Sequence, residues 1–200
     1  IKEDSSAVKD SFVAVADEIV DEFSGSIADV GCATGAFPAY LLKRFPSAQV
    51  AGIEYLTELR EQASRNFEHI DFISGDVTDK LSVAKTYDVI TMLGVLCIFD
   101  KYELVLANVL SWLKPNGVLI LHNMISETDV DVFVKYSPSS SKFNEKKLES
   151  GWNIISEKSL GLVCSANGSK LIKVKRFELT VDLRPKPQYP LRSWNELDTD

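Results

Sequence analysis

The sequence has few cysteines, no long apolar run and no excess of basic residues. Its three cysteines, Cys32, Cys97 and Cys164, form no C-x-x-C pair and no cysteine–histidine spacing typical of a metal site. This count argues against a disulfide framework or a structural zinc site, and it fits a reducing cytoplasm. The formal net charge of −7 argues against nucleic acid or an anionic membrane as the main partner. No apolar run approaches the roughly 20 residues that span a bilayer.

The composition is that of an ordinary globular protein. The chain has 200 residues, of which 45% are hydrophobic and 26% are charged. A chain of this length can bury a sizeable core without disulfide bonds or bound metals. The length predicts one domain over residues 1–200. No leader peptide is evident. The chain starts at Ile1 rather than Met, so a processed or truncated fragment is one interpretation.

Apolar strands alternate with helical segments along the first 123 residues. Strands are predicted at residues 27–30, 49–54, 71–73, 87–92 and 118–121. Helices are predicted at residues 8–23, 38–45, 56–66 and 101–113, from apolar stripes or from composition. This alternation indicates an α/β fold, with a mostly parallel sheet that has helices on both faces.

The pattern becomes irregular after residue 123. Residues 137–141, Ser-Pro-Ser-Ser-Ser, predict a mobile loop. Residues 171–183 alternate in places and predict one long antiparallel strand near the C-terminus.

A glycine loop and two acids follow the first three strands. Gly31 and Gly35 lie between a strand and a helix start, where glycine permits a sharp turn and the close approach of a ligand. Glu54 ends the second strand, where a carboxylate can accept both hydroxyls of a ribose. Asp76 follows the third strand and can accept an adenine amino group. Taken singly, each feature is more often a tight turn, a solvated acid or a cap. Together they predict a nucleoside site at one edge of the sheet.

A dinucleotide site is the first alternative. Its G-x-G-x-x-G loop would need glycine at Gly31, Ala33 and Ala36, and the Cβ of Ala33 would crowd a pyrophosphate. An NAD-dependent oxidoreductase therefore stays open as a poorer match. A cofactor-binding module without catalytic activity is the second alternative.

Several segments in this order resemble the class I S-adenosylmethionine-dependent methyltransferases. These segments are residues 29–35 (DVGCATG), Glu54, residues 75–76 (GD), residues 87–90 (YDVI) and residues 113–117 (LKPNG). The resemblance covers about residues 25–123. It implies a Rossmann-like three-layer sandwich with S-adenosylmethionine as the cofactor, and residues 124–200 as a substrate-covering segment and terminal strand.

The resemblance also implies roles on the methionine side of the cofactor. The loop under the methionine part comprises Gly31, Cys32, Ala33 and Gly35. Asp29 helps to hold the ammonium group, directly or through the loop. Met92 and Leu93 line the site near the sulfonium.

On the adenosine side, the resemblance assigns the ribose hydroxyls to Glu54. Tyr55 or Leu56 lies against the adenine, and Asp76 reads the adenine edge together with the backbone of Val77.

A catalytic base is harder to identify. His122 follows the fifth strand, and catalysis and simple packing are equally good interpretations of it. His69 precedes the third strand and is expected on the surface. Asp100 could act as a base, although capping of the helix that follows it is the better interpretation. No acidic trio marks a magnesium site, so no metal is predicted.

The acceptor is predicted to be the oxygen of a small molecule. The Asn/Asp-Pro-Pro-aromatic motif of amino-directed nucleic-acid enzymes is absent after the fourth strand, where Met-Leu-Gly-Val stands. Residues 151–159 and 177–194 more faintly resemble methyltransferases of bacterial surface-polysaccharide pathways, which implies a sugar or a sugar-phosphate or phosphoramidate precursor. Tyr136, Trp152 and Asn153 lie where such enzymes place substrate-covering segments, and each could equally belong to the core. That family's sheet ends in a two-stranded hairpin, so either the chain is truncated after Asp200 or its last strand is degenerate.

Overall fold

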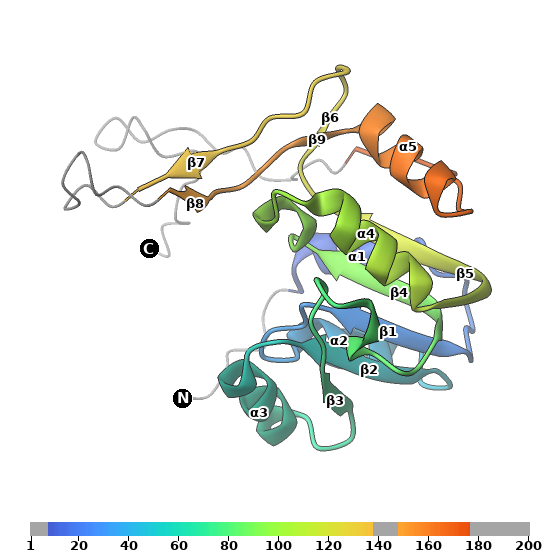
Figure 1. Cartoon of the computed structure of the whole chain (residues 1–200). Helices are drawn as coiled ribbons and strands as arrows, with labels where there is room; N and C mark the ends of the chain where they lie inside the picture. The colour runs from blue at the N-terminus through green and yellow to red at the C-terminus, as the bar shows by residue number, and fades with distance from the viewer. Residues whose placement is uncertain (1–7, 138–147, 177–200) are drawn as a thin grey trace, which may run out of the picture.

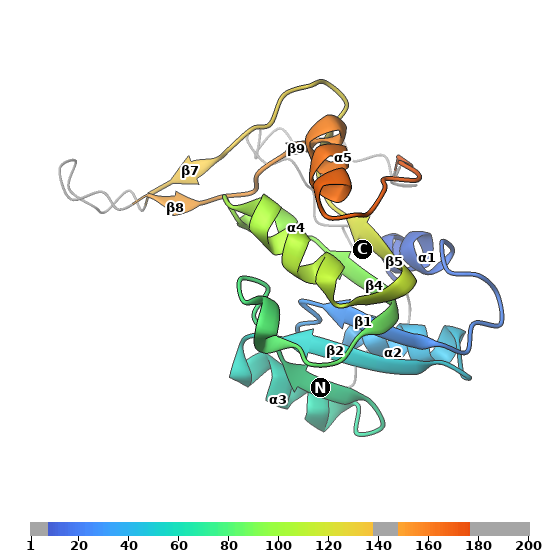
Figure 2. The same ribbon diagram turned by 45° about the vertical axis from the view of Figure 1, so that its right-hand side comes forward.

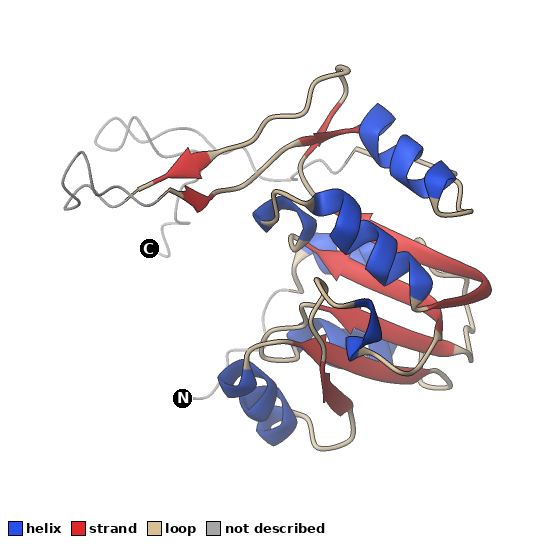
Figure 3. Cartoon of the chain, viewed as in Figure 1, coloured by secondary structure: helices blue, strands red, loops and turns tan. Residues whose placement is uncertain are grey.

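A five-stranded parallel sheet lies at the centre of the molecule (Figures 1 and 3). The computed structural model describes residues 8–137 and 148–176. The strands are β1 (Ser26–Val30), β2 (Gln49–Glu54), β3 (Asp71–Ser74), β4 (Tyr87–Leu93) and β5 (Leu113–His122). They lie in the order β3-β2-β1-β4-β5, and all neighbouring pairs are parallel. The order reverses between β1 and β4, which is where ligands bind in open sheets of this kind.

Helices cover both faces of the sheet, which confirms the predicted three-layer α/β fold. They are α1 (Asp10–Ala16), α2 (Ala36–Arg44), α3 (Thr57–Asn66), α4 (Tyr102–Ser111) and α5 (Glu157–Ala166), with short 3-10 turns η1 (Lys80–Ser82) and η2 (Leu96–Ile98). On one face, α1 and α2 form an apolar cluster that includes Phe37 and Leu41. On the other face, α4 and α5 contribute Leu106 and Leu160 to a second cluster. Each such buried side chain contributes about 1.5–3 kcal/mol relative to exposure.

An arm extends from the end of β5, and we define it as residues 124–137 and 148–156. It contains β6 (Ile125–Ser126), β7 (Lys135–Tyr136), β8 (Glu149–Ser150) and β9 (Ile155–Ser156). β7 and β8 pair antiparallel, whereas β6 and β9 pair parallel. The β7–β8 tip projects from the end of the molecule toward which the strand arrows point (Figures 1 and 2). The arm therefore stands at the ligand-binding edge of the sheet.

Some predicted elements differ from the structure. Helix α1 ends at Ala16, and the N–H groups of Glu18 and Ile19 then donate to carbonyl oxygens three positions back, as in tighter turns. Ile19 is still buried, so the apolar stripe was informative even though the helix stops. Helix α5 was not predicted, since Gly161 and the polar residues around it hide a short stripe.

The predicted C-terminal strand is wrong in the part of it that the structure describes. Residues 171–176 have no regular secondary structure, and residues 177–183 lie outside the described part of the chain. Most of the predicted mobile loop, residues 138–141, also lies outside it. Within the described ranges, no helix is long and apolar enough to cross a membrane.

Candidate functional site

The loop after β1 is shaped by backbone conformations that favour glycine. Gly31 has φ 73° and Gly35 has φ 88°. A Cβ at Gly31 would lie 2.3 Å from a methyl of Val95, and one at Gly35 would lie 2.7 Å from the ring of Phe72. Side chains would therefore clash as well as strain the turn. Ala33, with φ 47°, also adopts the left-handed conformation, which is uncommon for a residue with a Cβ.

Glu54, at the end of β2, holds this loop in place. Its Oε2 accepts a hydrogen bond from the backbone N–H of Ala33 at 3.0 Å, and its Oε1 accepts one from Leu56 at 2.9 Å. The side chain of Arg60 donates to the carbonyl oxygen of Glu54 at 3.2 Å. The buried carboxylate therefore links the carboxyl ends of β1 and β2.

Asp29 lies next to this link, inside the end of β1. Only 3% of the residue is exposed, and the hydroxyl of Thr91 donates to its Oδ1 at 2.8 Å. Burial raises the pKa of Asp29 to about 7; the charge of Glu54 adds to this rise, and the hydrogen bond from Thr91 opposes it. Burial, together with the charges of Asp29 and Glu54, raises the pKa of Cys32 to about 12. Cys32 therefore remains a thiol and has no nucleophilic role at neutral pH.

A cavity of about 340 Å³ opens at this edge. Six residues predicted from the sequence line it: Asp29, Gly31, Cys32, Ala33, Leu93 and His122. The start of α1 lines it as well, through residues that the sequence analysis missed: Lys9, Ser11 and Phe12. No local pattern could have identified these three residues, because only the packing of α1 brings them to the loop.

His122 ends β5 and also lines this cavity. Its carbonyl oxygen accepts a hydrogen bond from the N–H of Gly94 at 2.8 Å, which ties the ends of β4 and β5 together. Burial lowers the pKa of the imidazole below its usual value. His122 is therefore neutral at pH 7 and can accept a proton.

The remaining predicted residues lie outside this cavity. Asp76 accepts from the N–H of Thr78 at 2.8 Å, as in a side-chain-capped turn, while Tyr55 and Leu56 are exposed beyond β2. Val77 is buried. Met92 is fully buried in the core below the sheet edge, so it does not reach the place near the sulfonium that was predicted for it.

A second hollow, of about 510 Å³, lies at the opposite edge of the sheet. Residues 21–24 and 44–47, which precede β1 and β2, line it. None of the predicted site residues reaches it, and ligands of open α/β sheets bind at the other edge. We therefore assign the function to the smaller cavity.

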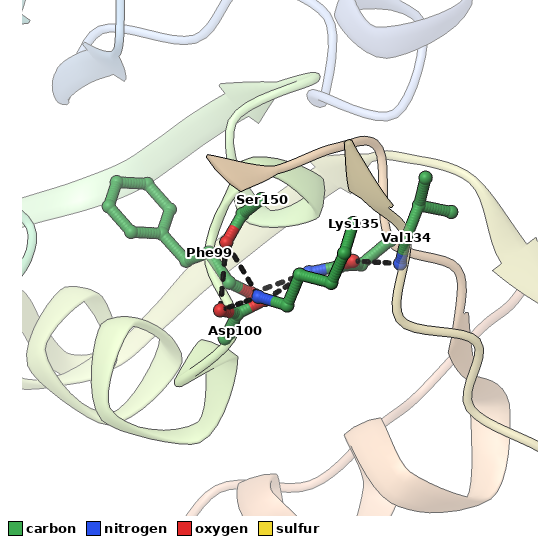
Figure 4. Close-up of polar contacts among 6 residues, drawn as sticks. Phe99, Asp100, Val134, Lys135 and Ser150 are labelled. Atoms are coloured by element: carbon green, nitrogen blue, oxygen red, sulfur yellow. Dashed lines mark hydrogen bonds and ion pairs between the residues drawn. The ribbon is translucent and has the colours of Figure 1, made fainter. Parts of the chain in front are cut away.

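Asp100 belongs to a polar cluster rather than to a helix cap (Figure 4). Lys101 takes the N-cap position of α4, so the expected capping role of Asp100 is wrong. Its carboxylate forms an ion pair with Lys135 of β7 and accepts from Ser150 of β8 at 2.8 Å. The hydrogen bond from Lys135 contributes most to a lowered pKa of Asp100. Asp100 is thus a paired anion that anchors the arm.

Asn153 completes this cluster and is fully buried. Its side chain accepts from the N–H of Val134 at 2.9 Å and donates to the carbonyl oxygen of Phe99 at 3.2 Å. Its own N–H donates to the carbonyl oxygen of Cys97 at 2.7 Å. By contrast, Trp152 is 66% exposed. Asn153 therefore joins both halves of the arm to the segment that follows β4.

Comparisons with known proteins agree with this geometry. Residues 27–117 match the family model of a methyltransferase domain. A malonyl-[acyl-carrier protein] O-methyltransferase of Halalkalibacterium halodurans is 37% identical over 110 residues, which cover 52% of this chain and 40% of that protein. A dTDP-4-amino-2,3,4,6-tetradeoxy-D-glucose N,N-dimethyltransferase of Saccharopolyspora spinosa is 33% identical over 102 residues. These residues cover 48% of this chain and 39% of that protein. The chain thus spans about two fifths of the length of these two curated relatives.

Solved structures share the fold. CalS10, an amino pentose methyltransferase from Micromonospora echinaspora solved with bound S-adenosylmethionine, superimposes with a TM-score of 0.60 at 18% identity. The match covers 82% of this chain and 84% of that one. Within residues 8–137 and 148–176, no cluster of three or more His, Cys, Asp or Glu side chains could hold a metal ion.

The residues at the cavity fit S-adenosylmethionine. The buried carboxylate of Asp29 can pair with an ammonium group, and each oxygen of Glu54 accepts one N–H and retains a further lone pair for a hydroxyl. Gly94 leaves open space, since no atom of the described residues lies within 4 Å of a Cβ built there. The match of residues 27–117 to the methyltransferase-domain model, the sheet order and the fold shared with CalS10 agree with one another: this segment is similar to the class I S-adenosylmethionine-dependent methyltransferases.

Proposed function

We propose that the protein transfers a methyl group from S-adenosylmethionine to an oxygen of a small-molecule acceptor. The observation that carries this proposal is the cavity at the carboxyl edge of the sheet, where Asp29 and His122 line one space. An anion that can hold the cofactor and a neutral base that can activate an acceptor thus face the same volume.

We propose the cofactor-binding roles that the family resemblance implies. Asp29 binds the ammonium group and Glu54 the ribose hydroxyls. Asp76, with the backbone of Val77, reads the adenine edge, and Tyr55 or Leu56 covers the ring. When bound, the cofactor supplies an electrophilic methyl group on a positively charged sulfur.

On the methionine side, the loop residues Gly31, Cys32, Ala33 and Gly35 lie under the amino-acid part. Leu93 lines the cavity there and excludes water. Holding a donor and an acceptor in line can lower a barrier by about 7–11 kcal/mol.

His122 is the proposed general base. A hydroxyl acceptor must lose its proton as the new bond forms, and a neutral imidazole at the cavity wall can take that proton. The lowered pKa of His122 keeps it in the accepting form at pH 7. An acceptor that is already anionic, such as a phosphate oxygen, would not need this step.

We further propose that the arm covers the acceptor. Its base is fixed to α4 and α5 through Asp131, which accepts from the hydroxyl of Tyr102 at 3.2 Å and from the hydroxyl of Ser159 at 2.8 Å. Its middle is fixed through Asn153 and Asp100. The arm thereby overhangs the edge at which the cofactor is proposed to bind (Figure 1).

The proposed acceptor class is a sugar or a sugar-phosphate or phosphoramidate precursor of a bacterial surface polysaccharide. The 37% identical relative is an O-methyltransferase, which favours oxygen. The Saccharopolyspora relative and CalS10 act on amino sugars, which favours a sugar but makes nitrogen the competing acceptor atom.

The working partner is therefore a small molecule, and we propose no nucleic-acid or membrane partner. A cytoplasmic location suits three free cysteines, of which Cys32 and Cys97 are buried.

The test uses the full chain with S-adenosylmethionine labelled with ¹³C at the methyl group and a panel of sugar, sugar-phosphate and amino-sugar acceptors. The carbon resonance of the transferred methyl distinguishes an O-methyl from an N-methyl product. We expect O-methylation that is slowed at least 100-fold in His122→Gln. An N-methyl product overturns the oxygen assignment. Cofactor binding without transfer to any acceptor, or to a cell extract, favours the non-catalytic module. Binding of NADH in place of the cofactor favours the oxidoreductase.

A further inference from the structure

The cavity is lined by a positively charged residue as well as by an acid. Lys9, just before α1, lines the cavity together with Ser11 and Phe12. Its ammonium lies 5.3 Å from the centre of the Phe12 ring, and that ring also lines the cavity. Among residues 8–137 and 148–176, no carboxylate forms an ion pair with Lys9. The charge of Lys9 is therefore available to a ligand.

The backbone of the glycine loop offers few donors to an anion. The N–H groups of Gly31 and Cys32 both donate to the carbonyl oxygen of Ile53, at 2.8 and 3.2 Å. The N–H of Ala33 donates to Glu54, and that of Gly35 donates to the carbonyl oxygen of Cys32. Four N–H groups that could otherwise bind an anionic group are thus already used within the fold.

The amino-acid part of the cofactor carries an ammonium and a carboxylate on one carbon atom. A site for it needs a negative group on one side and a positive group on the other. Asp29 is a buried acid on the loop side of the cavity, and the loop leaves the carboxylate with few backbone donors. Lys9 is the cation that lines the same space.

We propose that Lys9 binds the α-carboxylate of S-adenosylmethionine, while Asp29 binds its ammonium group. Helix α1 then serves as one wall of the cofactor site in addition to packing against the sheet. The inference rests on the cofactor of the proposed function but not on the acceptor. An anionic group of the acceptor is the other possible source of a negative charge at Lys9, and the experiment separates the two.

The test compares three ligands by calorimetry with the full chain. S-adenosylmethionine carries the ammonium and the carboxylate, its decarboxylated form keeps the ammonium and the sulfonium but lacks the carboxylate, and 5′-methylthioadenosine is a neutral thioether that lacks all three charges. We expect the wild type to prefer S-adenosylmethionine over the decarboxylated form by about tenfold, as for a hydrogen-bonded charge pair. Lys9→Met should abolish this preference, and Lys9→Arg should keep most of it.

Two further variants make the assignment specific. Asp29→Asn should weaken the binding of S-adenosylmethionine and of its decarboxylated form by a similar factor. The ratio of these two affinities, and the affinity for 5′-methylthioadenosine, should not change. Lys43→Met, an exposed lysine of α2 outside the cavity, should change none of the three affinities.

A Lys9→Met protein that still prefers S-adenosylmethionine over its decarboxylated form overturns the proposal. So does one that loses only turnover with anionic acceptors, since Lys9 would then bind the acceptor. A wild-type chain that binds none of the three ligands overturns the proposed function itself, so the two failures are distinguishable.

Discussion

Thr91 and Asp29 face each other across the two central strands of the sheet. They are register partners in β4 and β1, and the hydroxyl of Thr91 donates to the carboxylate of Asp29 at 2.8 Å. Both residues are buried, so this hydroxyl is the polar side chain that holds the acid toward the cavity. The pair ties the core of the sheet to the proposed ammonium site.

Replacing Thr91 by Val should weaken cofactor binding. Without the hydroxyl, the buried carboxylate loses a hydrogen bond, its pKa rises, and less of it is ionised at pH 7. We expect a loss of about tenfold in affinity for S-adenosylhomocysteine and of about 1–3 kcal/mol in the free energy of unfolding. Thr91→Ser should restore the affinity. Equal binding by the Val variant, measured by calorimetry at pH 7, would contradict the role of the pair.

Cofactor affinity should depend on pH through Asp29. The pKa of about 7 means that this carboxylate is protonated below that pH and cannot pair with an ammonium. Affinity for S-adenosylhomocysteine should therefore fall, by up to about tenfold per pH unit, as the pH decreases from 8 to about 5. Asp29→Asn should bind weakly with a flat profile over the same range. A wild-type profile that is also flat would show that Asp29 is ionised throughout.

The contribution of Asp29 to the stability of the ligand-free protein should increase as the pH falls, whereas cofactor affinity should decrease. The folded-state pKa of Asp29 lies above its ordinary value of 3.8, so the folded chain holds a proton that the unfolded chain releases between these values. The contribution of Asp29 to stability is therefore greatest at low pH and declines toward pH 7, by up to about 1.4 kcal/mol per unit. The difference in unfolding free energy between wild type and Asp29→Asn, followed by urea titration, isolates this effect from other acids.

Glu54→Ala should weaken cofactor binding by at least about 1 kcal/mol, because a charge-assisted hydrogen bond to the ribose is lost. It should also destabilise the fold, since the N–H groups of Ala33 and Leu56 lose their acceptor. Glu58→Ala, an exposed acid on α3, is the matched control and should change neither quantity. Unchanged affinity in Glu54→Ala would show that Glu54 only shapes the loop.

Asn153→Ala should loosen the arm while leaving cofactor affinity unchanged. The substitution leaves the N–H of Val134 and the carbonyl oxygen of Phe99 without their partner, at a cost of about 1–3 kcal/mol in the local fold. Amide hydrogen exchange should accelerate at residues 132–136, and the KM for the acceptor should rise. Asn66→Ala, at the exposed end of α3, is the control. Loss of cofactor affinity instead would place Asn153 among the cofactor-positioning residues.

Tyr87→Phe should keep or increase stability, by up to about 1 kcal/mol, because the buried hydroxyl of Tyr87 has no hydrogen-bond partner among the residues that the structure describes. Tyr102→Phe makes the matched comparison, since the hydroxyl of Tyr102 donates to Asp131 at 3.2 Å. That variant should lose about 1 kcal/mol. Thermal unfolding of the two variants measures both changes in stability. Destabilisation of Tyr87→Phe would reveal a hydrogen-bond partner for that hydroxyl.

Local patterns in the sequence were enough to predict the five strands, four of the helices and the resemblance to the methyltransferases. Short, mostly apolar runs such as residues 27–30 are typical of buried strands, and the positions of Gly31, Glu54 and Asp76 at or after the ends of successive strands put them at one edge. The secondary structure after residue 123 is harder to predict from the sequence, because its short strands and α5 depend on packing rather than on periodicity.

The sequence by itself determined the α/β order and the loop and acids that resemble those of the methyltransferases, since these arise from neighbouring residues and strand ends. The tertiary structure alone decided that Lys9 lines the cavity, that Asp100 pairs with Lys135 rather than capping α4, and that Met92 lies in the core. The physical reason is distance along the chain. Asp100 and Lys135 are 35 residues apart, and no local periodicity reports which side chains meet when separate elements pack together.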